Sequence, residues 1–421
     1  MKFEDYRISP EIKRSLKELE FKRPTDIQYK AIPPVLKGED VLAIAQTGTG
    51  KTAAFAIPVI HLINQQKSTN EDGGIQCVVL VPTRELAIQI TDVFKEIGKY
   101  TNVVSLTVYG GVDQDPQIKQ LKQGVDILIA TPGRMFDLVS QKHIFLNKVK
   151  VLILDEADHM LDLGFIKDIN DIKRFLPKKH QTLFFSATID KEIKKLAYSL
   201  VNNPIRIQIS PNDPVAKNIE HAVAFIEMDD KRFFLERIIN TYPDNKILVF
   251  VRTKIRAERV MKALERVNIA SNTIHGGKDQ EDRFIALNAF KSGSNNVLIA
   301  TDVSARGIDI PDVDFVINYD LPEQTENYVH RVGRTGRASK KGQAISFCSV
   351  GEKEILEEIE QFLDKKINAL EISKNEYLET LDFSSETKDD WKTLIKQTEE
   401  LENLKKKKTK SRATRQAKRK K

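Results

Sequence analysis

The chain has 421 residues, of which 40% are hydrophobic and 30% charged, and at about 150 residues per domain this is enough for two hydrophobic cores with some remainder. This composition excludes a collagen-like, mucin-like or wholly disordered chain. The formal net charge is +7, but residues 405–421 alone hold eleven Lys and Arg and no acid, so the rest of the chain carries −4. The local excess predicts a polyanionic partner for the C-terminal end, while the body need not be electropositive.

Cysteine use and hydropathy predict a soluble protein of a reducing cytoplasm that makes no contact with a membrane. Cys77 and Cys348 both lie in apolar, strand-like runs, where cysteine acts as a small hydrophobic residue. Two cysteines can build neither a disulfide framework nor a zinc site. The N-terminus has acids at Glu4 and Asp5 and no apolar leader, and the longest apolar stretch, residues 53–60, falls far short of the roughly 18 residues of a membrane span.

From residue 41 onward, short continuous apolar runs alternate with longer helical patterns. Runs without polar alternation are typical of strands buried on both faces, and intervening helices are typical of right-handed parallel crossovers. We therefore expect a first α/β domain over residues 1–209, built on a mainly parallel sheet flanked by helices. Its strands are expected near residues 41–45, 76–81, 104–109, 125–130, 149–155, 181–186 and 205–209.

A second α/β domain is expected after a break in this rhythm. Residues 210–217 contain two prolines and several turn formers without periodicity, which predicts a linker. The pattern returns over residues 218–365, with a helix over 254–266 and strands near 221–228, 246–251, 295–301, 314–319 and 343–349. Beyond about residue 364 the strand signals stop. We expect residues 366–421 to form a C-terminal extension, with an exposed helix over 384–404 and a disordered basic tail over 405–421.

A glycine-rich loop follows the first apolar run and precedes a helical pattern, which is the context that a phosphate-binding loop requires. Backbone N–H groups would surround the phosphates, Lys51 would neutralise the β and γ oxygens, and the Thr52 hydroxyl would hold Mg²⁺. A glycine turn that merely starts a helix is the alternative. The loop comprises Ala45, where the usual pattern has Gly, and then Gln46, Thr47, Gly48, Thr49, Gly50, Lys51 and Thr52.

Clustered carboxylates follow the apolar run at residues 151–154. We expect Asp155 to bind Mg²⁺ and Glu156 to polarise the attacking water. Acids also favour the first turn of a helix for electrostatic reasons, but the phosphate loop upstream favours the catalytic interpretation.

A basic cluster lies in the second domain. On a helix, His330, Arg334 and Arg337 would share one face because they are spaced by four and three residues. Gly333 and Gly336 indicate a helix that is loose or ends there, which would let the guanidinium groups reach forward. Arginine suits phosphoryl transition states because its fork is planar and always charged. A solvated basic face is the alternative.

Residues 155–158 spell D-E-A-D, and the motifs from Phe3 to about Phe362 together resemble those of the DEAD-box ATP-dependent RNA helicases, with an arrangement similar to the bacterial RhlE-like branch. The resemblance implies two tandem RecA-like domains that bind ATP and RNA between them. It implies that Phe21 stacks on adenine and Gln28 reads its edge, with Phe3 as the upstream aromatic, and that Asp309 belongs to a motif touching both ligands.

The resemblance also assigns the remaining motif residues. Ser186, Ala187 and Thr188 would couple hydrolysis to strand separation, although a Ser before a helix is often only an N-cap. Arg334 and Arg337 stand at the arginine-finger positions, and His330 at the residue that links back to the D-E-A-D acids. The implied RNA contacts are Arg84, Gly111, Thr131, Arg134, Thr253, Arg283, Thr301 and Asp302.

These observations predict a monomeric RNA-dependent ATPase that uses ATP and Mg²⁺ to separate short RNA duplexes locally and non-processively. Recognition is expected to be independent of sequence, since the implied RNA contacts suit phosphates and ribose hydroxyls rather than base edges. The basic tail is expected to be an additional RNA tether. An ATP-gated RNA clamp and a DNA translocase are the alternatives, and ribosome assembly, mRNA decay and cold adaptation are all compatible with the predicted activity.

Overall fold

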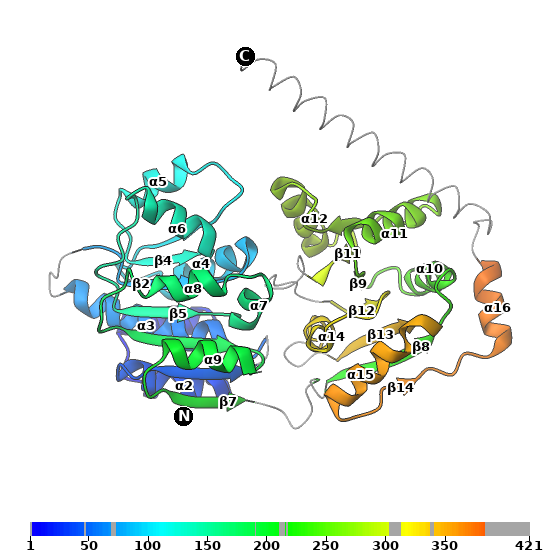
Figure 1. Ribbon diagram of the computed structural model, residues 1–421, viewed down its shortest axis with the longest axis horizontal. Helices are drawn as coiled ribbons and strands as arrows, with labels where there is room; N and C mark the ends of the chain where they lie inside the picture. The colour runs from blue at the N-terminus through cyan, green and yellow to red at the C-terminus, as the bar shows by residue number, and fades with distance from the viewer. Residues whose placement is uncertain are drawn as a thin grey trace, which may run out of the picture. The chain divides into compact units, whose positions relative to one another are not determined.

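A computed structural model describes residues 2–45, 48–68, 73–189, 191–209, 215, 218–302, 313–336 and 341–383. The chain divides into two compact units, and among these residues the first unit ends at Asn218 and the second begins at Ile219 (Figure 1). Most of the predicted linker, the predicted helix over 384–404 and the basic tail lie outside the described residues.

The first unit is built on a seven-stranded parallel sheet in the order β3-β4-β2-β5-β6-β1-β7. All seven strands expected from the apolar runs are present. Their bounds are β1 (Val41–Ala45), β2 (Cys77–Leu80), β3 (Ser105–Val108), β4 (Ile127–Ala130), β5 (Val151–Leu154), β6 (Gln181–Ser186) and β7 (Ile205–Ile209).

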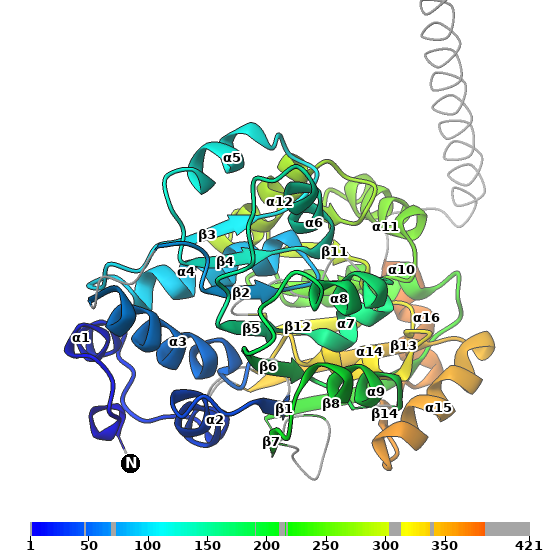
Figure 2. The same ribbon diagram turned by 60° about the vertical axis from the view of Figure 1, so that its left-hand side comes forward.

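Helices cover both faces of this sheet, which explains why its five inner strands are buried along their whole length, whereas the outer strands β3 and β7 are only partly buried. In β1, Val41 and Ala43 pack into one core, while Leu42 and Ile44 pack into the other. Figure 2 shows the sheet between the two helical layers. The helices are η1 (Phe3–Asp5), α1 (Pro10–Glu18), α2 (Asp26–Leu36), α3 (Lys51–Ser68) and α4 (Arg84–Ile97), followed by α5 (Asp115–Leu121), α6 (Pro132–Ser140), α7 (Ala157–Asp162), α8 (Ile166–Ile172) and α9 (Lys191–Leu200).

The second unit repeats this design with a parallel sheet in the order β10-β11-β9-β12-β13-β8-β14. Its strands are β8 (Ile219–Phe225), β9 (Ile247–Phe250), β10 (Asn272–Ile274), β11 (Val297–Ala300), β12 (Phe315–Asn318), β13 (Gly342–Cys348) and β14 (Asn368–Ala369). Its helices are α10 (Lys231–Thr241), α11 (Lys254–Arg266), α12 (Gln280–Ser292), α14 (Thr325–Val332), η2 (Val350–Glu352), α15 (Lys353–Leu363) and α16 (Lys374–Phe383). The prediction of two α/β units with parallel sheets is confirmed.

The second unit continues past residue 365, where the sequence predicted the second domain to end. Strand β14 pairs with β8, and the Leu370 N–H donates to the Val223 carbonyl at 2.8 Å. Helix α16 packs on α10, with the Tyr377 ring 4.9 Å from that of Phe234 and the Tyr377 hydroxyl donating to Asp230. The expectation that strand structure stops near residue 364 is therefore corrected, because backbone pairing with β8 holds a two-residue strand that has no apolar signal of its own.

Both cysteines are buried and free. Burial raises the pKa of Cys77 above its ordinary range and that of Cys348 to about 11, so neither is a reactive thiolate at neutral pH. In the part of the chain that the structure describes, no helix is long and apolar enough to cross a bilayer.

Candidate functional site

Most residues predicted to carry chemistry in the first unit follow the carboxyl ends of its strands, whereas Phe3, Phe21 and Gln28 precede the first strand. Parallel strands end at one edge of the sheet, which is where open α/β sheets bind ligands. The strand order therefore fixes how the segments follow one another along that edge (Figure 2). From β3 to β1 they are Gly110–Gly111, Thr131–Arg134, Thr83–Arg84, Asp155–Glu156, Ser186–Thr188 and Gly48–Thr52. The predicted RNA segments and the phosphate loop thus occupy opposite ends of one edge, with the carboxylates between them.

The phosphate loop connects β1 to α3. Ala45 ends the strand, Gly48 and Gly50 have φ of +81° and +92°, and the helix begins at Lys51; Gln46 and Thr47 lie outside the described residues. The Lys51 side chain is 6% exposed, and its ammonium has no hydrogen-bond acceptor among the described residues. Because a buried ammonium is costly without an anion, this environment favours a phosphate ligand.

Gln28 joins the phosphate loop to the N-terminus of α2. Its Oε1 accepts the Thr25 N–H at 3.0 Å, and its Nε2 donates to the Gly50 carbonyl at 3.1 Å. A β-carbon at position 50 would lie 2.5 Å from that Nε2, so the contact requires glycine. Phe21 lies nearby in sequence and is partly buried, with Phe3 edge-on to it at a ring-centroid distance of 5.8 Å.

Asp155 and Glu156 sit where β5 turns into α7. Asp155 is 3% exposed, and burial raises its pKa to about 6 against the opposing effect of the nearby Lys51 ammonium. Glu156 adopts the left-handed conformation, with φ of 51° and ψ of 49°. A non-glycine residue in this region costs of order 1 kcal/mol or more and is typical of functional sites.

A hydrogen-bonded link joins the D-E-A-D segment to the segment after β6. The Asp158 Oδ2 accepts the N–H groups of Ala187 and Thr188, each at 3.0 Å, and the Thr188 hydroxyl at 3.2 Å. The hydroxyl of Ser186 is buried and has no partner among the described residues. Three hydrogen bonds therefore connect the carboxylate segment directly to Ala187 and Thr188.

The four implied RNA contacts of the first unit, Arg84, Gly111, Thr131 and Arg134, follow the adjacent strands β2, β3 and β4. Gly111 has φ of +76°, and a β-carbon there would overlap the Arg84 guanidinium, so the two segments touch. Arg134 donates from Nη2 to the Val112 carbonyl at 2.8 Å. Thr83 caps α4 by accepting the Leu86 N–H at 3.3 Å, which directs the N-terminus of that helix toward the same edge. Helix N-termini with nearby guanidinium groups suit phosphates.

The second unit presents an equivalent edge. Thr253 follows β9 and caps α11 by accepting the Arg256 N–H at 3.2 Å, while Thr301 and Asp302 follow the neighbouring strand β11. Arg283 lies in the first turn of α12. The residues implied for RNA binding thus lie at or near one sheet edge within each unit.

The basic cluster of the second unit spans the end of α14. The helix ends at Val332 with Gly333 as its C-cap, so a continuous helical face for residues 330, 334 and 337 does not form. Arg334 is 3% exposed and its Nε donates to the His330 carbonyl at 3.2 Å. Arg337 and Asp309 lie outside the described residues.

Comparisons with known proteins agree with this geometry. The family model described as DEAD/DEAH box helicase matches residues 25–196, and the one described as Helicase conserved C-terminal domain matches residues 230–339. The DEAD-box ATP-dependent RNA helicase RhpA of Helicobacter pylori (strain B128) is 41% identical over 382 residues, covering 90% of this chain and 76% of that protein. The chain belongs to the DEAD-box ATP-dependent RNA helicases.

Further relatives place it within the same family. The DEAD-box ATP-dependent RNA helicase CshA of Bacillus subtilis (strain 168) is 40% identical over 370 residues, covering 87% of this chain and 74% of that one. The structure of S. cerevisiae Dbp5 bound to RNA and ADP BeF3 matches with a TM-score of 0.79 at 30% identity, covering 95% of this chain and 99% of that one. The sequence-based assignment to a DEAD-box helicase with RecA-like domains is confirmed, while the RhlE-like branch stays a prediction.

The DEAD-box site fits a magnesium ion held mainly by its substrate. Within the described residues, no three His, Cys, Asp or Glu side chains gather as a metal site. Magnesium usually keeps several waters and binds one or two carboxylates together with substrate phosphates, so a ready-made protein cage is not required. Asp155 supplies a buried carboxylate, and Thr52 lies in the first turn of α3 beside Lys51.

The sequence did not indicate a role for Arg331, whose side chain connects several segments of the DEAD-box protein's second unit. Its side chain is 1% exposed and makes a two-point contact with Asp302, at 2.5 and 2.7 Å. It also donates to the Asp320 carbonyl at 2.6 Å and lies 5.1 Å from the Phe250 ring centroid. The Asp302 carboxylate, implied to contact RNA, is thus engaged by Arg331. The sequence feature that could have indicated this role is the position of Arg331 within the basic stretch H-R-V-G-R-T-G-R, residues 330–337.

A second missed residue is Glu258, which stabilises the loop before α12. Its Oε1 accepts hydrogen bonds from His275 at 2.8 Å and Thr273 at 2.9 Å, and lies 3.3 Å from the Lys278 ammonium. The hydrogen bond from His275 is the main reason that the pKa of Glu258 falls to about 2, with Thr273 and Lys278 adding to it. The segment that leads to Arg283 is thereby fixed.

Proposed function

We propose that this DEAD-box protein hydrolyses ATP in response to RNA and uses the cycle to separate short duplexes, or to remodel RNA–protein complexes, locally and without sequence preference. The observation that carries the proposal is the single sheet edge on which the phosphate loop, the D-E-A-D carboxylates and the RNA-type segments follow one another. The similarity to Dbp5 bound to RNA and ADP BeF3 supports it.

In the proposed reaction, the first unit holds the triphosphate. Lys51 neutralises the β and γ oxygens, while Thr52 and Asp155 hold Mg²⁺, which supplies charge neutralisation on the phosphates. Glu156 orients the attacking water by accepting its proton. Gln28 and Phe21 bind the adenine, and because Gln28 also bonds Gly50, base recognition acts directly on the phosphate loop.

The second unit contributes the arginines. Arg334 and Arg337 are proposed to stabilise the charge that develops on the transferring phosphoryl group, which is worth roughly 10³ to 10⁵ in rate. Hydrolysis then depends on both units acting on one nucleotide. If RNA binding favours that state, RNA raises ATPase activity, and by reciprocity ATP raises RNA affinity.

The link from Asp158 to Ala187 and Thr188 provides a route between chemistry and RNA release in this proposal. Loss of the γ-phosphate changes the charge next to Glu156, and Asp158 lies two residues further along the same turn. Three hydrogen bonds carry its displacement to the segment after β6. His330 is proposed to connect this region to the second unit.

The proposed function is tested by the choice of activating polymer. We expect single-stranded RNA to raise ATP turnover far more than DNA of equal length, and ATP to release the short strand of an RNA duplex that has a single-stranded overhang. Turnover and strand release are measured in the same reaction. Equal activation by DNA would favour a translocase, and ATP-dependent RNA binding without strand release would favour a clamp.

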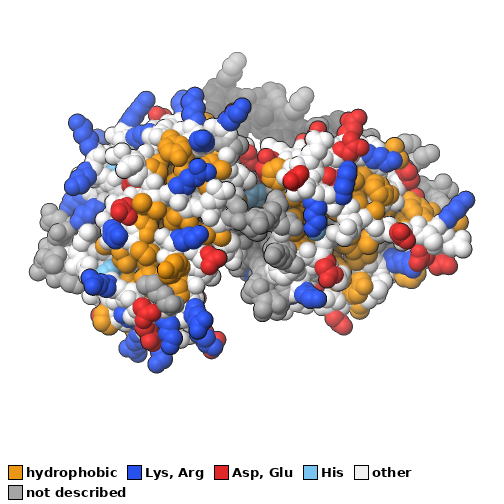
Figure 3. Space-filling view, turned by 90° about the horizontal axis from the view of Figure 1, so that it is seen from below, with side chains coloured by type: hydrophobic (Ala, Val, Ile, Leu, Met, Phe, Trp, Pro, Cys, Tyr) orange, Lys and Arg blue, Asp and Glu red, His pale blue; other side chains and the backbone are white. Residues whose placement is uncertain are grey.

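The basic tail is proposed as an RNA tether. Figure 3 shows many Lys and Arg side chains on one face of the first unit. The densest run of positive charge in the sequence is residues 405–421, which contain eleven Lys and Arg and no acid. For single strands, each neutralised phosphate steepens the slope of log affinity against log salt concentration by about 0.7. If half of the tail's charges bind phosphates, the slope steepens by roughly three to four. A chain ending at Leu404 should therefore show a shallower salt dependence and need more RNA for half-maximal ATPase, with nearly unchanged maximal rate. Identical salt slopes for the two chains would reject the tether.

A cytoplasmic location, a monomeric state and a role in ribosome assembly, mRNA decay or cold response stay predictions from the sequence. Crosslinking the protein to RNA in its own cells and sequencing the bound RNA would distinguish these roles. Sedimentation with and without RNA would test the monomer.

A further inference from the structure

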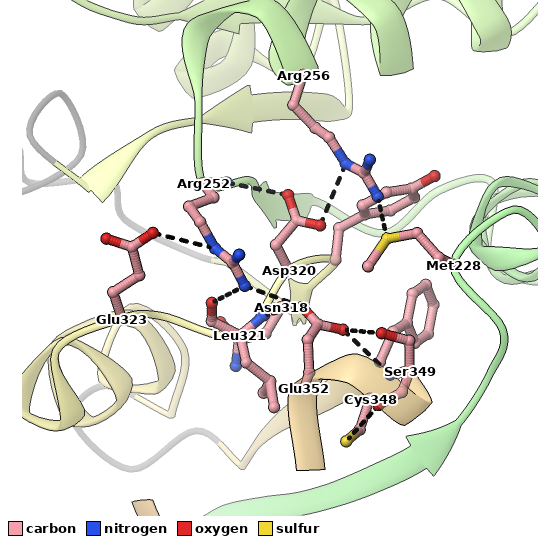
Figure 4. A network of polar contacts seen from close by, with 12 residues as sticks. Met228, Arg252, Arg256, Asn318, Asp320, Leu321, Glu323, Cys348, Ser349 and Glu352 are labelled. Atoms are coloured by element: carbon pink, nitrogen blue, oxygen red, sulfur yellow. Dashed lines mark hydrogen bonds and ion pairs between the residues drawn. The ribbon is translucent and has the colours of Figure 1, made fainter. Parts of the chain in front are cut away.

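A polar network that includes Arg252, Arg256 and Asp320 surrounds the N-terminus of α11 in the second unit (Figure 4). On one side, the Arg252 backbone N–H donates to Asp320 Oδ2 at 3.1 Å. On the other, the Arg256 guanidinium pairs with Asp320 Oδ1 at 3.2 Å. Since Thr253 lies between these two arginines and accepts the Arg256 N–H, the Asp320 carboxylate holds the turn that carries its hydroxyl.

Glu352 connects this turn to two further segments. Its Oε1 accepts the Arg252 guanidinium at 3.2 Å and the Leu321 N–H at 3.2 Å. Its Oε2 accepts the Lys231 ammonium at 2.5 Å, together with the N–H and hydroxyl of Ser349 at 3.1 and 2.8 Å. One carboxylate therefore joins the segments that follow β9, β12 and β13 (Figure 4). Its contact with Lys231 adds the start of α10.

The network is buried at its centre and open at its rim. The Lys231 side chain is fully buried and also donates to the carbonyls of Tyr319 and Phe347, at 2.8 and 3.1 Å. Glu352 is 2% exposed, whereas the Arg252 side chain is 33% exposed. A fixed interior with a partly exposed arginine beside Thr253 is the arrangement expected of a support that positions a ligand-binding group.

We propose that Glu352 is a positioning residue for RNA binding: through Arg252 and together with Asp320, it holds the N-terminal turn of α11 so that Thr253 presents its hydroxyl to the RNA backbone. The inference rests on the proposed function and deepens it by naming what orients one of its RNA contacts. The Thr253 oxygen accepts the capping N–H, so its proton is available for a phosphate oxygen. A turn that is already ordered loses less conformational entropy when RNA binds.

The same network could serve stability alone, and helix α15 supplies a matched control. Glu360, which lies on α15, is also buried, and its carboxylate likewise combines an ion pair, to Lys366 at 2.5 Å, with a backbone N–H, that of Ile367 at 2.9 Å. These contacts stabilise the chain near β14, away from the turn that carries Thr253. Glu360→Gln therefore makes the same change at another buried carboxylate that is not connected to α11, although its partner Lys366 is exposed where Lys231 is buried.

The test measures the RNA concentration for half-maximal ATPase and the rate at saturating RNA in full-length protein. We expect Glu352→Gln and Arg252→Gln to raise the half-saturating RNA concentration by about tenfold. The rate at saturating RNA should stay within about twofold of the wild type, and Glu360→Gln should leave half-saturation unchanged. Arg252→Gln keeps the Lys231–Glu352 pair, so it carries the test if Glu352→Gln does not fold, as judged by circular dichroism.

A double-mutant cycle with Thr253→Ala separates positioning from direct contact. If Glu352 and Arg252 act through Thr253, their substitutions should raise half-saturation by less than about twofold in the Thr253→Ala background. Full effects in that background would overturn the proposal, as would equal shifts in Glu352→Gln and Glu360→Gln. Absence of RNA stimulation in the wild type would refute the proposed function itself. If Glu352→Gln and Arg252→Gln both reach half-maximal ATPase at the wild-type RNA concentration, only the positioning role is refuted.

Discussion

Replacing Lys51 by Ala and Glu156 by Gln should each abolish ATP turnover, but only the Lys51 change should weaken ATP binding. Lys51→Ala removes the counter-charge of the phosphates, so ATP affinity should fall with the rate. Glu156→Gln keeps the nucleotide site and loses only the base that orients water, so this variant should retain ATP and RNA together. Nucleotide binding by a fluorescent ATP analogue and turnover by phosphate release distinguish the two.

The environment of Lys51 adds an expectation about stability. Because its ammonium is buried without a hydrogen-bond acceptor among the described residues and its charge is opposed by nearby Asp155, Lys51→Ala should lower the thermal midpoint of the nucleotide-free protein little. Lys67→Ala, at the other end of α3, is the control: its partner Asp126 lies 2.6 Å away and is almost buried, so this variant should melt lower yet keep its turnover. Turnover at the wild-type level in Lys51→Ala and Glu156→Gln would show that the phosphate loop and D-E-A-D segment are not the ATPase site.

The sheets could be predicted from the sequence because most of their inner strands are buried on both faces. An unbroken apolar run such as V-L-A-I-A packs its residues alternately into the two hydrophobic cores, so a strand buried on both faces can be recognised from its sequence. Strands β10 and β14 left no such signal. They comprise three and two residues, and backbone pairing with β11 and β8 holds them in the sheet.

The candidate site was predictable segment by segment, but the contacts between segments were not. The phosphate loop and the D-E-A-D carboxylates each lie in one short stretch, where residue type and spacing indicate the chemistry. The contact of Asp158 with Thr188 joins residues 30 apart, and that of Glu352 with Lys231 joins residues 121 apart. Such pairs depend on which strands are neighbours, and the strand order follows from packing rather than from local sequence.

The chain on either side of Arg337 is anchored within the second unit. The Thr335 side chain is buried, and its hydroxyl donates to the carbonyls of Val313, at 2.6 Å, and Asp314, at 3.1 Å. A β-carbon at Gly342, where β13 begins, would overlap Thr335, so the two segments pack backbone against side chain. Arg337 lies outside the described residues and falls between these two fixed positions in the sequence.

Arg337→Ala should accordingly reduce RNA-stimulated hydrolysis by at least about a thousandfold, while ATP affinity measured without RNA stays near that of the wild type. The guanidinium is proposed to act on the charge that develops during transfer and not on ground-state binding, so the loss should fall on the rate. Arg337→Lys should recover only part of the lost rate, because an ammonium lacks the planar fork that matches phosphate oxygens.

Lys341→Ala, which removes an exposed charge four residues further along the chain, is the control and should keep wild-type turnover. Single-turnover hydrolysis at saturating ATP and RNA measures the step directly. Undiminished hydrolysis in Arg337→Ala would remove this residue from the catalytic set and leave Arg334 as the arginine proposed to act on the transferring phosphoryl group.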